Sequence, residues 1–210
     1  MVRRMSTVSE CMEHHRLALR EGHSPKPGPA VLVEAMANEE VLLPEHEEKK
    51  PARIRWSTMK VQMTDEDLKQ HHEARIERML ALQPLIGNDS PVHLIEKHSD
   101  THATHVCLGR AKRNDILIVD DTVSSLHAQL QDDDQQVWLC DMNSSNGTFV
   151  NRRRLVNNER VFLVNGDCVR FGRRVFYFLT GERWLLFLEL RIVQQYGRHA
   201  GPTSSPSGAK

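Results

Sequence analysis

From Pro91 onward, hydrophobic positions in this 210-residue chain fall into short runs separated by polar turns. Such runs are typical of strands, whose side chains alternate between two faces. The Asn165-Gly166 pair between two of the runs is a strong hairpin signal. Strands are predicted at residues 92–96, 104–108, 116–119, 127–130, 137–140, 148–150, 160–164, 168–171 and 175–179. Many short strands joined by turns predict a mainly β fold, a β-sandwich of about 9–11 short strands.

Two segments have the hydrophobic spacing of helices. The first runs from Asp65 to Gln83, where Thr64 can cap the start and Pro84 marks the stop. The second covers residues 183–196, whose apolar positions recur at helical spacing although its middle also alternates as a strand would. We expect a C-terminal helix that packs on the sandwich or offers a surface to a partner.

The chain divides by composition into five parts. The N-terminal part is weakly patterned and contains several prolines, apart from a short predicted helix over Val8 to Arg20. The predicted parts are a weakly structured N-terminal extension (1–62), a helix and linker (63–88), the sandwich domain (89–180), an apolar C-terminal helix (181–197) and a disordered tail rich in Gly, Ser and Pro (198–210).

Charge and cysteine usage narrow the class of function. The 28 Lys and Arg residues balance the 28 Asp and Glu residues, so no global field attracts nucleic acid or a membrane, and neither is expected as a partner. The cysteines show no CxxC spacing, and most lie in apolar runs, which predicts reduced, structural thiols. No continuous apolar stretch follows the basic start, so neither a secretory signal nor a membrane span is expected, and a cytoplasmic location is predicted.

Three short signals stand in a fixed order within the strand-rich region: Gly109-Arg110, Ser124-Ser125-Leu126-His127 and Asn146-Gly147-Thr148. Each lies at the end of a strand-like run, so a guanidinium, a hydroxyl loop and an Asn-Gly turn could converge on one small anion. Each alone has a plainer interpretation, namely an exposed arginine, a turn-forming serine and a favoured hairpin turn. No nucleophile with a base, metal cage or nucleotide loop accompanies them.

This order and spacing resemble the forkhead-associated (FHA) domain, a module that binds phosphothreonine peptides and has the pattern Gly-Arg, Ser-x-x-His and Asn-Gly-Thr. Asp141 before the Asn-Gly turn and Asn165-Gly166-Asp167 before the late strands strengthen the resemblance, which covers roughly residues 90–180. It implies a non-catalytic signalling adaptor that binds threonine-phosphorylated protein segments through loops at one end of the sandwich. The implied partner is a phosphorylated protein such as a Ser/Thr kinase or its substrate, and no cofactor or metal is expected.

The resemblance also assigns the phosphate contacts. Arg110 occupies the position of the family's phosphate-binding arginine, and Gly109 that of the glycine that allows a tight backbone beside it. Ser124 matches the serine whose hydroxyl donates to the phosphate. Ser125 stands where the family often has Arg or Lys, and its hydroxyl and backbone N–H remain able to donate.

A second loop supplies contacts to the peptide. Asn146 matches the asparagine whose side-chain amide holds the main chain of the bound peptide, and Gly147 supplies the backbone angles that aim it. Ser145 is a further candidate contact to phosphate or backbone. His127 matches a structural histidine that braces the loop, and no acid is apparent that would orient it as a base for Ser124.

Three positions depart from the family pattern. Ser125 removes a second positive charge, for which the nearby Lys112 and Arg113 are candidates to compensate. Asn143 and Arg152 stand where the family has glycine, which puts the shape of their loops in question.

Other constellations suggest rival functions. The basic cluster 152–154 lacks aromatic stacking partners, so contacts with acidic peptide residues or solvent are expected rather than nucleic acid. His98, His102 and His105 straddle a predicted turn, which argues against a metal site. Residues 1–88 contain no recognisable catalytic set, so no enzyme is expected.

One alternative keeps the fold but changes the function. The departures at the binding loops and the apolar segment 183–196 also fit a phosphate-independent interaction or oligomerisation scaffold, with self-association through that segment. Matched peptides with and without phosphate distinguish the two functions.

Overall fold

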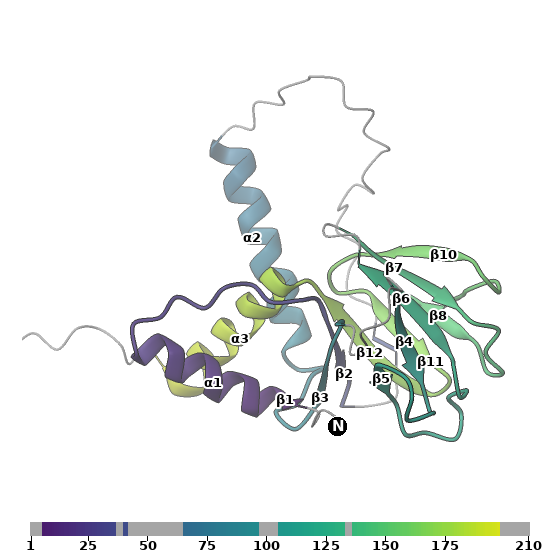
Figure 1. The fold of residues 1–210 in the computed structure, drawn as a ribbon. Helices are drawn as coiled ribbons and strands as arrows, with labels where there is room; N and C mark the ends of the chain where they lie inside the picture. The colour runs from purple at the N-terminus through teal and green to yellow at the C-terminus, as the bar shows by residue number, and fades with distance from the viewer. Residues whose placement is uncertain (1–5, 37–39, 42–64, 97–104, 133–135, 198–210) are drawn as a thin grey trace, which may run out of the picture.

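The computed structural model describes residues 6–36, 40–41, 65–96, 105–132 and 136–197, which form three layers (Figure 1). Two β-sheets face each other, and helices cover the outer face of one of them. The mainly β sandwich with an N-terminal and a C-terminal helix predicted from the sequence is thereby confirmed.

The strands are short, and all pairs are antiparallel except that between β4 and β5. One sheet contains, in spatial order, β1 (Ser6–Thr7), β3 (Pro91–Leu94), β2 (Val31–Glu34), β12 (Arg174–Leu179), β11 (Cys168–Phe171), β8 (Thr148–Val150) and β9 (Arg153–Arg154). The other contains β10 (Arg160–Leu163), β7 (Val137–Asp141), β6 (Ala128–Asp132), β4 (His105–Gly109) and β5 (Ile116–Leu117). Every predicted strand thus lies within a residue or two of an observed one, apart from the shorter β5.

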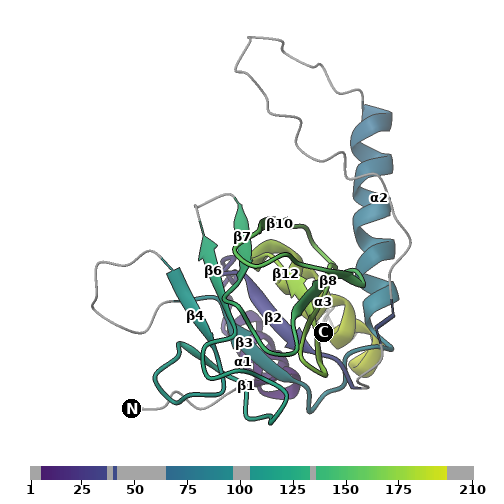
Figure 2. The same ribbon diagram turned by 90° about the vertical axis from the view of Figure 1, so that its right-hand side faces the viewer.

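Three helices pack on the seven-stranded sheet: α1 (Val8–Arg20), α2 (Asp65–Leu82) and α3 (Gly181–Tyr196). Figure 2, turned by 90° from Figure 1, looks onto the sandwich with α1 and α3 behind the strands. In both views the N-terminal end of α2 extends away from the sandwich. These helices confirm the predictions for residues 8–20, 65–83 and 183–196, whereas the predicted tail, residues 198–210, lies outside the described residues.

Strand β12 shows why the middle of the seven-stranded sheet is almost continuously apolar. Phe176 and Phe178 point into the core between the two sheets, while Val175, Tyr177 and Leu179 point into a second core beneath the helices. Because successive side chains of a strand face opposite sides, a strand covered on both faces must be apolar at nearly every position.

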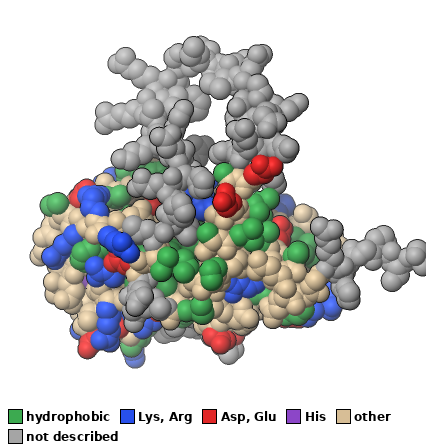
Figure 3. Space-filling model, turned by 180° about the vertical axis from the view of Figure 1, so that it is seen from behind, with side chains coloured by type: hydrophobic (Ala, Val, Ile, Leu, Met, Phe, Trp, Pro, Cys, Tyr) green, Lys and Arg blue, Asp and Glu red, His purple; other side chains and the backbone are tan. Residues whose placement is uncertain are grey.

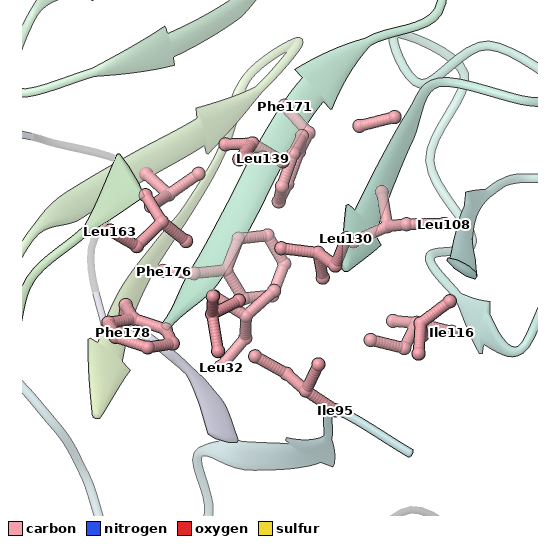
Figure 4. Packing of buried hydrophobic residues seen from close by; sticks show 14 of the residues in the cluster. Leu32, Ile95, Leu108, Ile116, Leu130, Leu139, Leu163, Phe171, Phe176 and Phe178 are labelled. Atoms are coloured by element: carbon pink, nitrogen blue, oxygen red, sulfur yellow. The ribbon is translucent and has the colours of Figure 1, made fainter. Parts of the chain in front are cut away.

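Each core draws residues from distant parts of the chain. Figure 4 shows the core between the sheets, which contains Leu32, Leu108, Leu130, Leu139, Leu163, Phe171 and Phe176. The core beneath the helices contains Val8, Met12, Met79, Leu82, Trp184, Phe187 and Leu188. The helices are therefore part of the same folded unit as the sandwich.

The N-terminal segment corrects one prediction. Residues 1–62 were expected to be a weakly structured extension, and the domain to begin at residue 89, yet residues 31–34 form β2 in the interior of the seven-stranded sheet. Leu32 enters the core between the sheets, and Val31 and Val33 enter the core beneath the helices. A four-residue strand that is buried on both faces shows no alternation, so its sequence pattern did not reveal it.

Arg191 of α3 connects the helical layer to the segment that follows α2. Arg191, which is 9% exposed, donates hydrogen bonds to the backbone carbonyls of Gln83 and Ile86 and to the side chains of Gln83 and Asn88. Both carbonyls belong to the turn that follows α2, so the guanidinium supplies donors to a buried turn that joins α2 to α3. Burial lowers the pKa of Arg191, which nevertheless remains a cation at physiological pH.

The surface of the protein is mixed in character. Figure 3, seen from behind, shows Lys and Arg side chains mostly over the half that contains the sandwich, and hydrophobic side chains nearer the middle. Large hydrophobic side chains that are exposed among the described residues include Leu17, Leu19, Val193 and Tyr196 of α1 and α3.

Candidate functional site

The predicted site residues meet at one end of the sandwich. Strands β4 and β7 end there, and β6 and β8 begin there, because paired antiparallel strands alternate in direction. The first loop follows Gly109, the second precedes Ala128 and the third follows Asp141. These three loops are consequently neighbours. Hydrogen bonds described below join all three loops, so the predicted convergence is what the geometry shows.

Gly109 and Arg110 leave β4 against the backbone of the second loop. A Cβ at Gly109 would lie 2.5 Å from the carbonyl oxygen of Ser125, so only glycine fits. The Arg110 N–H donates to the carbonyl of Ser124 at 2.9 Å, and its side-chain Nε donates to the carbonyl of Val123 at 3.2 Å. The Nε bond holds an exposed guanidinium in place and leaves both terminal nitrogens without a partner among the described residues.

Ser124 connects the second loop to the third. Its hydroxyl oxygen accepts a hydrogen bond from the backbone N–H of Ser145 at 3.0 Å, and its proton donates to the Ser145 hydroxyl oxygen at 3.5 Å. The second bond is long for a hydroxyl donor, so a closer, charged acceptor can replace the Ser145 oxygen. Ser125 is exposed, and its carbonyl accepts from the Asn114 side chain at 2.6 Å, which ties the first loop to the second.

His127 braces these loops from within the protein. The ring is fully buried, its Nδ1 accepts from the backbone N–H of Ser124 at 3.0 Å, and its Nε2 donates to the carbonyl of Gly147 at 3.2 Å. One neutral tautomer satisfies both bonds, and burial lowers the pKa of His127, which favours that neutral form. Because the ring meets the Ser124 backbone rather than its hydroxyl, the pair is not arranged as nucleophile and base.

Asn146 and Gly147 form the outer part of the third loop. The Asn146 amide donates to the carbonyl of Thr122 at 2.8 Å, while its side-chain oxygen has no partner among the described residues. Gly147 has a φ of 83°, a conformation that favours glycine. Asn146 is thus held by one amide proton with its oxygen still able to accept from a peptide N–H.

Asp141 closes the third loop from beneath. Its buried carboxylate accepts from the Ser144 N–H at 3.1 Å and from the Ser144 and Thr148 hydroxyls, both at 2.6 Å. Burial acts to raise the pKa of Asp141, but these hydrogen bonds outweigh it and hold the pKa below its usual range. Neither Ser144 nor Thr148 was predicted as part of the site, although an Asp followed three residues later by Ser is a turn pattern.

Asp120 organises the second loop in a similar way. It accepts from the backbone N–H of Thr122 at 2.9 Å, from the Thr122 hydroxyl at 2.6 Å and from Arg173 Nε at 2.9 Å. Burial acts to raise the pKa of Asp120, and the bonds from Thr122 and Arg173 overcome this effect and lower it. Since the Thr122 carbonyl receives Asn146, Asp120 also positions the third loop.

A chain of charges links this loop to the N-terminal strand β2. The buried Glu34 of β2 forms an ion pair with Arg174, and Arg174 lies 3.9 Å from the carboxylate of Asp120. The sequence signal for this link is weak, because the partners come from segments far apart in the chain. The segment expected to lie outside the domain therefore supports the candidate site.

The departures at Asn143 and Arg152 are accommodated by left-handed backbone. Asn143 has a φ of 58°, and the two-residue turn between β8 and β9 has φ values of 50° at Asn151 and 67° at Arg152. Asn adopts this conformation readily, whereas Arg does so at a steric cost. The loops keep the conformation that glycine would favour without having glycine.

No group of three or more His, Cys, Asp and Glu side chains among the described residues is placed to hold a metal ion, and His98 and His102 lie outside them. No helix in the described ranges combines the length and the apolar character that crossing a bilayer requires. All four cysteines are free thiols.

The sandwich and its three joined loops define a β-sandwich binding domain. The family model of the FHA domain matches residues 106–172, inside the region where the resemblance was noted. Residues 106–172 of this chain therefore form an FHA domain.

Curated relatives share this region. The glycogen accumulation regulator GarA of Mycobacterium tuberculosis is 37% identical over 75 residues, which are 36% of this chain and 44% of that protein. The oxoglutarate dehydrogenase inhibitor of Corynebacterium jeikeium is 39% identical over 75 residues, 36% of this chain and 50% of that protein. The chain thus covers about half the length of these relatives or less.

One solved structure is likewise similar to part of this chain. The FHA-2 domain of an ABC transporter from Mycobacterium tuberculosis is 32% identical, covers 41% of this chain and 77% of that domain, and superimposes with a TM-score of 0.33.

Proposed function

We propose that this protein is a non-catalytic signalling adaptor that binds phosphothreonine-containing protein segments. The carrying observation is the Arg110 guanidinium, whose Nε is held by the carbonyl of Val123, the residue before Ser124, while both terminal nitrogens have no partner among the described residues. A phosphothreonine presents three acceptor oxygens and close to two negative charges. A planar guanidinium can donate to two of those oxygens at once.

Each predicted contact has a chemical role in this proposal. Arg110 binds two phosphate oxygens and the Ser124 hydroxyl donates to a third, with Ser125 and Ser145 as further donors at the rim. The Asn146 side-chain oxygen accepts from a backbone N–H of the bound segment. Gly109, His127 and Gly147 hold these groups in place, as their contacts support.

The proposed partner is a threonine-phosphorylated protein, either a Ser/Thr kinase or one of its substrates. Two of the relatives are described as a regulator and as an enzyme inhibitor, which supports a regulatory rather than a catalytic role. A cytoplasmic location and the absence of nucleic-acid and membrane partners remain predictions from the sequence.

The test is calorimetric titration of the full chain with a peptide chosen from a phosphothreonine library, against the same peptide without phosphate. We expect binding only with phosphate. Arg110→Ala should weaken it about 30- to 150-fold, since charge-assisted hydrogen bonds contribute about 2–3 kcal/mol. Arg110→Lys keeps the charge but loses the planar guanidinium, so its affinity for the phosphopeptide should lie between those of the wild type and Arg110→Ala.

Arg16→Ala is a matched control, because Arg16 lies on α1 and pairs with Glu13 away from the loops. Its affinity should equal that of the wild type. Equal affinity for both peptides, or no loss in Arg110→Ala, contradicts the proposal.

The alternative is a phosphate-independent scaffold that associates through residues 183–196. Much of the apolar surface of α3, including Trp184, Phe187 and Leu188, is buried against the protein itself, while Val193 and Tyr196 are exposed. Light scattering of the full chain and of a Val193→Glu variant tests this alternative. A monomer in both forms removes its support.

A further inference from the structure

Arg154 lies beside the third loop, which carries Asn146 and Gly147. It belongs to β9, which pairs with β8 so that Arg154 stands opposite Phe149. A Cβ built on Gly147 would be 2.7 Å from Arg154 Nε, which shows how closely the guanidinium passes the Asn-Gly turn. The side chain is exposed, and its guanidinium carbon lies 5.9 Å from the centre of the Phe149 ring.

The three arginines of the basic cluster differ in their partners. Arg153 forms an ion pair with Glu159 at 2.8 Å, and Arg152 donates to the carbonyl of Glu40 at 2.8 Å. Arg154 has neither an ion pair nor a hydrogen bond to any residue that the structure describes. Arg153 is thus the arginine of this cluster whose charge is paired with a described acidic side chain, while Arg152 is held by a neutral carbonyl. Arg154, which contacts the Asn-Gly turn, has neither kind of partner among the described residues.

Three other arginines near the site differ from Arg154, because each has an acidic partner. Arg170 pairs with Glu40, Arg173 with Asp120 and Arg174 with Glu34. These pairs neutralise the acids around the loops. A bound segment thus meets Arg154 as a free cation rather than as half of an ion pair.

The contacts also order the groups along the site. The first loop bonds to the backbone at Ser124, Ser124 bonds to Ser145, and the turn that follows at Gly147 lies against Arg154. Arg154 therefore adjoins the turn at Gly147 in the third loop, whereas Arg110 bonds to the second loop. A side chain that flanks the phosphothreonine reaches Arg154 where the segment passes the Asn-Gly turn.

We propose that Arg154 binds an acidic side chain of the phosphothreonine segment and gives the domain a preference for acidic flanking sequence. The proposal rests on the proposed function and adds the chemistry of the recognised segment. It assigns a specificity role to a residue outside the three motifs. The fully exposed position makes the contact modest and sensitive to salt.

The experiment uses the full chain and phosphothreonine peptides from the library screen. Each peptide is made with Glu or with Gln at flanking positions, first on the N-terminal and then on the C-terminal side. We expect wild-type protein to prefer Glu on one side by about 3- to 5-fold at low salt, the range of an exposed charge pair. The preference should shrink as salt is added.

Variants assign the preference to one residue. Arg154→Gln should lose it while binding the Gln peptide within about 2-fold of wild type, the scale of a surface substitution. Arg154→Lys should retain part of it, because the charge remains. Arg153→Gln, the matched control with an existing acidic partner, should behave as wild type.

The outcomes separate this inference from the proposed function. Equal binding of Glu and Gln peptides by the wild type, or an unchanged preference in Arg154→Gln, overturns the role of Arg154 and leaves phosphothreonine recognition intact. Failure of every phosphopeptide to bind overturns both.

Discussion

The hydroxyl oxygen of Ser124 accepts a hydrogen bond from the backbone N–H of Ser145 at 3.0 Å. This bond joins two loops that approach the candidate site from different strands. The proton of the Ser124 hydroxyl points to the hydroxyl oxygen of Ser145 at 3.5 Å, a long bond that a phosphate oxygen can replace. The same atom thus stabilises the site and serves as a predicted phosphate donor.

Ser124→Ala should therefore weaken phosphopeptide binding about 10- to 100-fold, since a hydrogen bond to a charged group contributes about 1.5–3 kcal/mol. Ser125→Ala is the comparison, because no hydrogen bond of the Ser125 hydroxyl is found within the described ranges and its loss should be smaller. Titration with one phosphothreonine peptide measures both. Equal losses in the two variants contradict the role assigned to Ser124.

Arg191 should contribute strongly to stability. Arg191→Leu removes the donors of the Gln83 and Ile86 carbonyls and leaves these groups buried without partners. We expect the free energy of unfolding to fall by about 2–4 kcal/mol, because unsatisfied buried groups cost about 1–3 kcal/mol each. Urea denaturation measures the change. Arg20→Leu, at an exposed position of α1, should change the free energy of unfolding little. Equal effects of the two substitutions would contradict the stabilising role of the Arg191 hydrogen bonds.

Arg152→Gly should stabilise the protein. Arg152 adopts a φ of 67° in the β8–β9 turn, which costs an L-residue about 1–2 kcal/mol. Glycine removes this cost but gains freedom in the unfolded chain, so we expect a net gain of about 0.5–1 kcal/mol. Thermal unfolding provides the measurement.

Asn151→Gly is the contrast at the adjacent residue of the turn. The Asn151 side chain donates to Asp167 at 2.8 Å and accepts from the Cys168 N–H at 3.0 Å, so its loss should destabilise the protein. A destabilising Arg152→Gly would show that the Arg152 contact to Glu40 outweighs the backbone strain.

Stability should fall as the pH is lowered below about 6.5, the ordinary pKa of histidine. Burial, assisted by the charge of Arg174, lowers the pKa of His93 to about 4. Between these values the unfolded chain binds a proton that the folded protein does not, so acid favours unfolding. Burial lowers the pKa values of His15 and His127 in the same direction.

Urea denaturation at pH 7.5 and pH 5 tests this expectation. His93 alone should contribute about 2 kcal/mol to the difference, because each pH unit below its unfolded pKa costs about 1.4 kcal/mol. His93→Leu removes this contribution. The buried Glu34 has the opposite effect on the pH dependence of stability, because burial raises its pKa. Glu34 is present in both the wild type and His93→Leu, so the comparison of the two proteins isolates His93. An unchanged pH dependence in His93→Leu would show that His93 is not buried as a neutral group.

The sequence by itself determined the features that depend on local chemistry. Alternating runs and turn residues located the strands from β3 to β12 except β9, and the motif order located Arg110, Ser124 and Asn146 at strand ends. Strand period and turn geometry arise from neighbouring residues, so they can be read without knowledge of distant contacts. The helix over Val8 to Arg20 was predicted from local sequence as well, whereas the capping box that Thr7 forms with Glu10 is a finding of the structure.

Only the tertiary structure decided which distant residues meet. Strand β2 lies inside a sheet because β3 and β12 pair with its two edges, and its buried faces leave no alternation to read. Arg153 and Arg174 have acidic partners and Arg154 has none among the described residues, although the three side chains are chemically alike. Ion pairs form according to long-range register and burial, which vary with the whole fold rather than with the spacing of residues along the chain.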